Sequence, residues 1–153
     1  MLVLPISLTF AAALAVINLW LAIRVGQHRV GQKVMHGDGG VPVIQKRMRA
    51  HSNFAEYVPI VLVLVVLLEL AWGQPMWLWV VAALYVVGRI LHALGMDAEQ
   101  GSPLRMIGFA ISALTMLGLA FAALMAVYSS GARADAAPKT FGTHEVPATA
   151  PAR

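Results

Sequence analysis

The sequence predicts an all-α integral membrane protein with four transmembrane helices packed as one bundle. Of the 153 residues, 59% are hydrophobic and only 12% are charged, which is typical of a membrane protein and excludes an ordinary soluble domain. Four apolar runs each reach about the 20 residues that a helix needs to cross a bilayer. Short polar stretches with Gly or Pro separate these runs, so consecutive helices are expected to be antiparallel.

The first predicted helix covers residues 2–23, which contain no charged side chain. Its start is similar to a signal peptide, but it lacks a basic leading segment and its apolar run is long enough to span, so we expect a retained helix. A polar loop is expected from Arg24 onward. The Gly-rich turn before Pro42 predicts that the second helix begins there and covers residues 42–72.

The third helix is predicted over residues 75–95 and the fourth over residues 104–128. Tryptophans typical of a membrane interface flank the uncharged connection between the second and third helices: Trp72, Trp77 and Trp79. Glu69 lies near that end of the second helix, where we expect it to be solvated or to pair with another helix. Residues 1–128 should form the membrane domain, and residues 129–153, rich in Ala, Pro and Thr, a disordered tail.

The distribution of basic residues predicts an orientation in the membrane. Six of the eleven Lys and Arg residues belong to the first loop and its margins: Arg24, Arg29, Lys33, Lys46, Arg47 and Arg49. The second loop has none, so loops one and three should be cytoplasmic and both termini periplasmic, in a bacterial inner membrane. The net charge of +4 therefore flanks membrane spans, and we expect contacts with lipid and none with nucleic acid.

The absence of cysteine limits the chemistry that the chain itself can supply. Without a thiol the chain forms no disulfide, has no cysteine nucleophile and offers no thiolate to a metal. The spacing of His28, His36 and His51 is not a metal-binding pattern, so no metal site is expected. Any thiol chemistry must therefore use a thiol that a substrate or cosubstrate brings.

The second predicted helix carries a polar stripe at its start. At 100° per residue, Arg49, Asn53 and Glu56 fall within about 60° of one another, with Tyr57 at the edge, whereas His51 points the opposite way. Each charged residue in a membrane helix costs about 2.5–3.5 kcal/mol on insertion scales, so such residues pair, face the bundle interior or bind a ligand. Arg49 and Glu56 are too far apart for a close pair within the helix. A structural network between helices and a ligand site remain the two alternatives.

The third helix has a similar stripe of Tyr85, Arg89 and His92, which Met96 continues, and Arg105 opens the fourth helix. Because the second and third helices are antiparallel, these groups should gather with the first stripe at the cytoplasmic end. The cluster is net cationic, which favours an anionic ligand. Snorkelling of Arg89 to lipid phosphates and a packing role for His92 are the alternatives for those two residues.

At this point the sequence resembles a known family. The stretch Arg49-Ala-His-Ser-Asn-Phe-Ala-Glu-Tyr-Val-Pro59 is similar to the helix-two signature of the MAPEG family, the membrane-associated proteins in eicosanoid and glutathione metabolism. Residues 88–95, followed by 105–108, resemble the helix-three and helix-four patterns of that family. Residues 36–40 resemble the first loop of its bacterial members. The resemblance covers roughly residues 1–128.

The resemblance implies a homotrimer that binds glutathione between neighbouring subunits at the cytoplasmic end. It implies that Glu56 holds the amino group of glutathione and Arg49 a carboxylate, and that Arg105 stabilises the glutathione thiolate. It further implies that Asn53 and Tyr57 bind glutathione, that His51 reaches a neighbouring subunit's site and that Arg89 supports the site. His92 can hydrogen-bond a ligand, so we expect it among the binding residues as well. Either Arg24 or Arg29 would match a basic contact from the first loop.

We therefore expect a glutathione transferase, with peroxidase activity as a further expectation, that acts on lipophilic electrophiles. His92 and Met96 stand where transferase members of the family often carry tyrosines, and Met96 cannot donate a hydrogen bond. The alternative is a non-catalytic membrane protein of the same fold that binds an anionic metabolite or scaffolds a partner. A small transporter is disfavoured because the polar residues gather at one end and do not line a path across the membrane.

Overall fold

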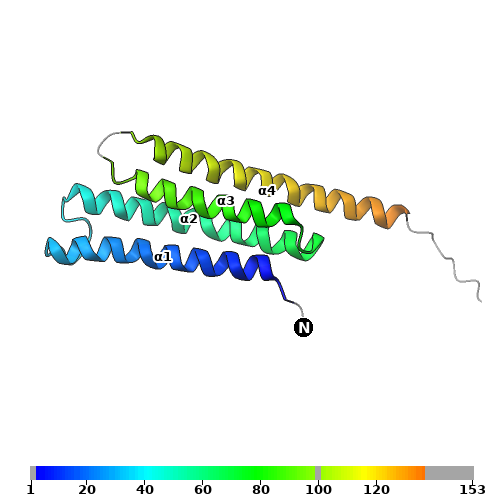
Figure 1. Ribbon diagram of the computed structural model, residues 1–153, viewed down its shortest axis with the longest axis horizontal. Helices are drawn as coiled ribbons and strands as arrows, with labels where there is room; N and C mark the ends of the chain where they lie inside the picture. Colours follow the sequence, from blue (N-terminus) through cyan, green and yellow to red (C-terminus); the bar gives the residue numbers. More distant parts are fainter. Residues whose placement is uncertain (1–2, 99–100, 137–153) are drawn as a thin grey trace, which may run out of the picture.

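The computed structural model describes residues 3–98 and 101–136, with side chains as far as residue 130, and it contains four helices in this part of the chain (Figure 1). They are α1 (Pro5–Gly31), α2 (Pro42–Trp72), α3 (Met76–Gly95) and α4 (Pro103–Ala136). Each helix is long and apolar enough to cross a membrane. The expected all-helical membrane fold is confirmed.

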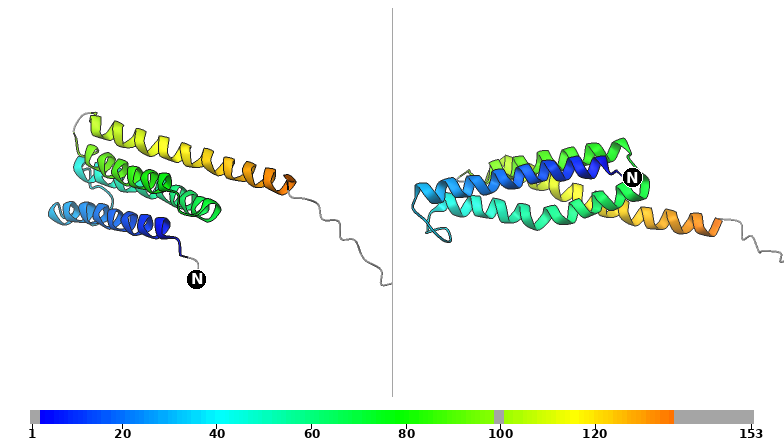
Figure 2. Two further views of the ribbon diagram at one scale, coloured as in Figure 1. Left: turned by 45° about the vertical axis from the view of Figure 1, so that its right-hand side comes forward. Right: turned by 90° about the horizontal axis from the view of Figure 1, so that it is seen from below.

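The helices form one bundle whose order in space follows the chain. α2 and α3 lie in the middle, while α1 and α4 lie on opposite sides of this pair (Figure 1). α4 continues past the ends of the other helices in every view (Figures 1 and 2). The end of α1, the starts of α2 and α4 and the end of α3 therefore share one end of the bundle, which we call the loop-rich end (Figure 1).

The core is built from apolar stripes at helical spacing. In α1 one side chain in every three or four is buried: Ile6, Phe10, Leu14, Ile17 and Leu21. They form one cluster with residues of the next two helices, among them Val61, Val65, Leu68, Leu78, Ala82 and Tyr85. The rings of Phe10 and Tyr85 meet edge to face, with centroids 5.8 Å apart. This cluster fixes the rotation of α3 and thereby the direction of its polar stripe.

Glu69 ties the start of α1 to the end of α2. The first N–H groups of a helix have no partner within the helix. The Glu69 carboxylate accepts hydrogen bonds from the backbone N–H of Ile6 at 3.0 Å and of Ser7 at 2.7 Å, and from the Ser7 hydroxyl at 2.6 Å. Its side chain is only 2% exposed. Of the two roles expected for Glu69, the structure shows the pairing of helices.

Glycines allow the backbones of α3 and α4 to touch at the loop-rich end. A Cβ on Gly95 would lie 2.2 Å from the Arg105 backbone N, and one on Gly108 would lie 2.3 Å from the His92 backbone N. Any larger residue would therefore push the two helices apart. This contact is what brings His92 and Arg105 close together.

Two predicted helix C-termini differ clearly from the structure, whereas the predicted starts differ by at most three residues. The first helix was predicted to end at residue 23 but continues to Gly31, because the polar residues after it leave the membrane without breaking the helix. The tail was predicted to start at residue 129, but α4 continues to Ala136, and the hydroxyls of Ser129 and Ser130 donate to carbonyls three residues back in the helix. The remainder of the predicted tail, 137–153, lies outside the described residues.

Candidate functional site

A cavity of about 450 Å³ opens at the loop-rich end between α2, α3 and α4. Its lining comes from three helices: Arg49, Ser52, Asn53 and Glu56 of α2, His92 and Met96 of α3, and Arg105, Met106 and Phe109 of α4. The structure thus brings Arg49, Asn53 and Glu56 to one cavity, as their shared helical face implied. It also brings His92 and Arg105 to the same cavity from sequence positions far away. What these side chains do toward a ligand stays a prediction.

The cavity has a polar part and an apolar part. Arg49, Asn53 and Glu56 on α2 provide a cation, an amide and an anion. Met96, Met106 and Phe109 provide apolar side chains on α3 and α4. In the single chain Arg49, Glu56 and Arg105 are exposed, so the cavity is open on one side. Such a site suits a ligand with a charged end beside an apolar one.

Arg89 lies beneath this cavity rather than in its lining. Its side chain is 2% exposed, and its Nη2 donates a hydrogen bond to Asn53 Oδ1 at 2.9 Å. The guanidinium carbon lies 5.5 Å from the ring centroid of Phe54 and 6.0 Å from that of Tyr57, within the range of cation–π contacts. Arg89 is therefore held inside the bundle, and the structure does not place it at the lipid headgroups.

Besides Arg89, two more of the predicted site residues lie outside the cavity lining. His51 points toward α1, where its Nε2 is 2.9 Å from Asn18 Oδ1. Tyr57 lies beside Arg89 and does not line the cavity, in keeping with its place at the edge of the stripe. Within one chain, His51 and Tyr57 are therefore not positioned to contact a ligand in this cavity.

Sequence reasoning did not identify Ser52, Met106 and Phe109 as site residues. Ser52 is three residues after Arg49, and Phe109 is four residues after Arg105, so each shares a helix face with a charged residue that was identified. Widening the first stripe by about 40° would have included Ser52, and extending the second by one turn beyond Arg105 would have included Phe109. Met106 carries no such signal, since a lone methionine in an apolar helix is more often a packing residue.

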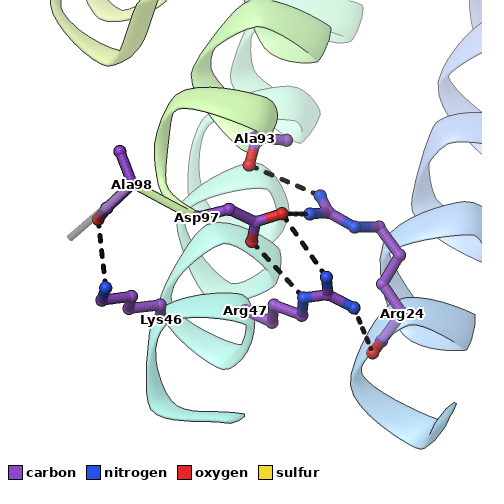
Figure 3. A network of polar contacts seen from close by, with 6 residues as sticks. All are labelled: Arg24, Lys46, Arg47, Ala93, Asp97 and Ala98. Atoms are coloured by element: carbon purple, nitrogen blue, oxygen red, sulfur yellow. Dashed lines mark hydrogen bonds and ion pairs between the residues drawn. The ribbon is translucent and has the colours of Figure 1, made fainter. Parts of the chain in front are cut away.

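A second polar cluster ties the loop-rich end together (Figure 3). The Asp97 carboxylate, just after α3, forms an ion pair with Arg24 of α1, and a second one with Arg47 of α2 in which Arg47 Nε lies 3.4 Å from Asp97 Oδ1. Arg47 Nη1 also donates to the Arg24 carbonyl at 3.2 Å, and Lys46 Nζ donates to the Ala98 carbonyl at 3.1 Å. This cluster anchors the connection between α3 and α4 to α1 and α2.

Arg24 and Arg29, the two candidates for a basic contact from the first loop, both have partners within the chain. Arg24 is 8% exposed and stacks on the Trp20 ring at 4.7 Å, so its guanidinium is committed to Asp97 within the same chain. Arg29 Nη2 donates to the Met48 sulfur at 3.4 Å. Neither arginine lines the cavity. Within residues 3–98 and 101–130, no three His, Asp or Glu side chains are grouped as metal ligands.

Comparisons with known proteins agree with the architecture. The model of the MAPEG family matches residues 7–125, which include α2 and α3 entirely, most of α1 and α4, and every residue that lines the cavity. The chain is also similar to the inner membrane protein YecN of Escherichia coli strain K12, with 28% identity over 90 residues, or 59% of this chain and 69% of YecN. YecN of Escherichia coli O6:H1 strain CFT073 matches to the same extent.

Proposed function

Because this chain belongs to the MAPEG family, we propose that it is a glutathione transferase that acts on lipophilic electrophiles, with peroxidase activity toward lipophilic hydroperoxides. The observation that carries the proposal is the shared cavity of Arg49, Asn53, Glu56, His92 and Arg105. Its volume of about 450 Å³ is within the usual range for small-molecule sites. The net positive lining suits glutathione, which carries two carboxylates and one ammonium group.

The polar part of the cavity would hold the ends of glutathione. Glu56 takes the ammonium group and Arg49 a carboxylate, because each side chain is exposed to the cavity and opposite in charge to its partner. Asn53 adds a hydrogen bond between them on the same helix face. His92 adds a further polar contact from α3. Arg89 supports Asn53 from beneath, and the Tyr57 ring lies beside Arg89.

Arg105 would activate the thiol. A free thiol has a pKa near 8.5, and a guanidinium beside it stabilises the thiolate, as does the start of a helix. At this site the guanidinium is that of Arg105, which lines the cavity, and the helix start is the first turn of α4, in which Arg105 lies. The thiol proton passes to solvent, the sulfur bonds to the electrophilic carbon, and the leaving group departs with the electron pair.

The same thiolate would reduce a hydroperoxide. The sulfur bonds to the terminal oxygen, the O–O bond breaks, and the alkoxide takes up a proton to give an alcohol. A second glutathione then converts the sulfenic acid to glutathione disulfide and water. Met96, Met106 and Phe109 form the apolar part of the cavity on which either lipophilic cosubstrate would lie.

We further propose a homotrimer in a bacterial inner membrane, with the loop-rich end in the cytoplasm and both termini in the periplasm. The cavity is open on one side in the single chain, and a neighbouring subunit would close it. His51 faces away from the cavity of its own subunit, which suits a contact with the site of a neighbour. The basic residues of the loop-rich end favour the cytoplasmic side.

Met96 favours a second candidate, a non-catalytic membrane protein that binds an anionic metabolite or scaffolds a partner. A thioether offers no hydrogen bond to a developing oxyanion or leaving group. Such a protein would keep the anion-binding part of the cavity and lack turnover. Binding and turnover experiments separate the two candidates.

The first test is calorimetric titration of the detergent-purified protein with glutathione, followed by measurement of the bound thiol's pKa from thiolate absorbance. We expect binding in the wild type and its loss in Glu56→Ala. Arg105→Ala should still bind glutathione but raise the pKa of the bound thiol by about one unit or more, because an adjacent cation is removed. Asp38→Ala, which removes a charge outside the cavity, is the control. Absence of wild-type binding at millimolar glutathione would contradict the proposal.

A further inference from the structure

The cavity has two walls that come from different parts of the bundle. Glu56 and its polar neighbours lie on α2, whereas Arg105 lies in the first turn of α4. α4 stays close to α3, because Gly95 lets the two backbones touch at Arg105. The separation of the two walls therefore depends on what holds the end of α3 and the start of α4 against α2.

Asp97 is a residue that makes this connection (Figure 3). It directly follows Met96, which lines the cavity, and α4 begins at Pro103, six positions further on. Its carboxylate pairs with Arg24 of α1 and with Arg47 of α2, whose Nε lies 3.4 Å from Oδ1 and whose Nη2 lies 3.5 Å from Oδ2. The two arginine side chains are only 10% and 18% exposed, so solvent screens these pairs less than it screens pairs on an open surface. Asp97 thus fastens the connection between α3 and α4 to the other two helices.

This arrangement depends on the charge of Asp97. Two guanidinium groups share the one carboxylate, and Arg47 Nη1 also donates to the Arg24 carbonyl at 3.2 Å, so the two arginines lie close together. Without the carboxylate, two partly buried cations would face each other uncompensated, which is destabilising. Lys46, whose Nζ donates to the Ala98 carbonyl at 3.1 Å, would remain as a weaker tie. We therefore expect loss of the charge to let the start of α4 move away from α2.

We propose that Asp97 is a positioning residue that holds the first turn of α4 against α2, so that Arg105 reaches the sulfur of a ligand bound on α2. Asp97 itself does not line the cavity. The attraction between a guanidinium and a thiolate decreases with their distance, so a small displacement of α4 weakens it. Contacts from α2 to the ends of the ligand do not depend on this displacement. The inference rests on the proposed use of glutathione.

Position and charge have opposite effects on the bound thiol. An anion near a thiol disfavours the thiolate, so removal of the Asp97 charge acting only through space should lower the thiol pKa. Displacement of Arg105 takes a cation away from the sulfur and should raise the thiol pKa. A purely structural role of Asp97 would lower the unfolding temperature and leave this pKa unchanged. The direction of the change in pKa therefore separates the three roles.

The test measures the affinity for glutathione by calorimetry and the pKa of the bound thiol by thiolate absorbance, on the full-length protein in detergent. In Asp97→Asn the thiol pKa should rise by about half a unit or more, while the affinity changes less than about threefold. Asp97→Glu keeps the charge and should restore a value close to that of the wild type. Asp38→Asn, the same replacement in the first loop, is the matched control and should change neither quantity.

Two further variants test whether Asp97 acts through Arg105. Arg47→Lys keeps the charge but loses the planar fork, so the thiol pKa should rise in the same direction, and this variant decides if Asp97→Asn does not fold. Asp97→Asn combined with Arg105→Ala should match Arg105→Ala alone. A thiol pKa that stays the same or falls in Asp97→Asn would overturn the positioning role only. A wild type that does not bind glutathione would overturn the proposed function and this inference with it.

Discussion

Met96 determines how many hydrogen-bond donors the cavity can offer to a reacting cosubstrate. Replacement by tyrosine would place a phenolic hydroxyl in the cavity where the wild type has a thioether. If the protein is a transferase, Met96→Tyr should raise turnover about fivefold or more, as expected when one hydrogen bond of about 1 kcal/mol is gained in the transition state. Steady-state rates with a chromogenic aryl halide and with a lipophilic epoxide would measure this.

The matched control is Met96→Phe, which adds a ring of similar size without the hydroxyl. Equal rates in the two variants would contradict a role for the hydroxyl. An epoxide, whose opening needs a proton at oxygen, should respond more strongly than an aryl halide, whose leaving group departs as a stable anion. A wild type without turnover that acquires it in Met96→Tyr would support the non-catalytic alternative for the natural chain.

At the residue level the sequence predicted relations within a helix better than relations between helices. The angular spacing on one helix is fixed, so Arg49, Asn53 and Glu56 could be placed together without coordinates. The ion pair of Arg24 with Asp97 joins residues 73 positions apart, and it depends on the rotation of α1 against α3. The packing of Phe10 on Tyr85 sets that rotation, and no local pattern encodes it.

Among the elements, the contact between α3 and α4 positions Arg105. A Cβ on Gly95 would meet the Arg105 backbone N at 2.2 Å, which forces the helices apart. Gly95→Ala should therefore destabilise the protein by about 1–3 kcal/mol, as overpacking usually does, and it should displace Arg105 from the cavity. Thermal unfolding in detergent measures the first effect, and the pKa of a bound thiol the second.

Gly118→Ala is the matched control for Gly95→Ala. Gly118 also lies in a membrane helix, but an added Cβ there meets nothing within 4 Å. This substitution should be neutral or should stabilise by roughly 0.5–1 kcal/mol, since alanine loses less conformational freedom than glycine in a helix. Equal behaviour of the two variants would show that the helices can separate at Gly95 without cost.

The cap that Glu69 provides is a second contact between elements that can be tested. In Glu69→Gln an NH₂ group replaces one of the oxygens that accept from Ile6, from the Ser7 N–H and from the Ser7 hydroxyl. The new NH₂ group would then face backbone N–H or hydroxyl groups that are also donors. The lost hydrogen bonds should lower the free energy of unfolding by about 1–3 kcal/mol. The unfolding temperature should fall, and the amides of Ile6 and Ser7 should exchange hydrogen faster. Glu56→Gln, an exposed carboxylate on the same helix, should leave both measurements unchanged.

Sequence patterns located the four helices and misplaced two of their ends. Hydropathy marks where a chain leaves the membrane, and a helix can continue beyond that point. Residues 24–31 include four polar side chains and no proline, and the single glycine before Gly31, Gly26, does not end the helix. α1 therefore continues through them, and Arg24 reaches Asp97 from this extension. The boundaries of the second and third helices were predicted well because Pro42 marks the start of α2, and the Trp72–Pro75 connection separates α2 from α3.

At the scale of the whole molecule, the proposed homotrimer predicts that two defective variants can complement each other in one assembly, which a monomer does not predict. If a site takes Glu56 from one subunit and His51 from its neighbour, neither Glu56→Ala nor His51→Ala alone should bind glutathione normally. Co-expression of the two variants should produce mixed trimers in which some sites have both side chains. Calorimetry on doubly tagged, co-purified complexes should then recover a fraction of wild-type binding. If assemblies shown to be mixed recover no glutathione binding, both residues belong to a site within one subunit.

The length of α4 has a consequence for whatever follows it in the chain. Its 34 residues extend over about 51 Å, whereas the hydrocarbon core of a bilayer is about 30 Å thick. Tilt absorbs part of this difference, but roughly three helical turns remain. The last turns of α4 thus act as a rigid spacer that carries the chain past the lipid headgroups. A label attached at Ala136 should be accessible to a membrane-impermeant reagent in intact vesicles of the right orientation, while one at Leu119 should be protected.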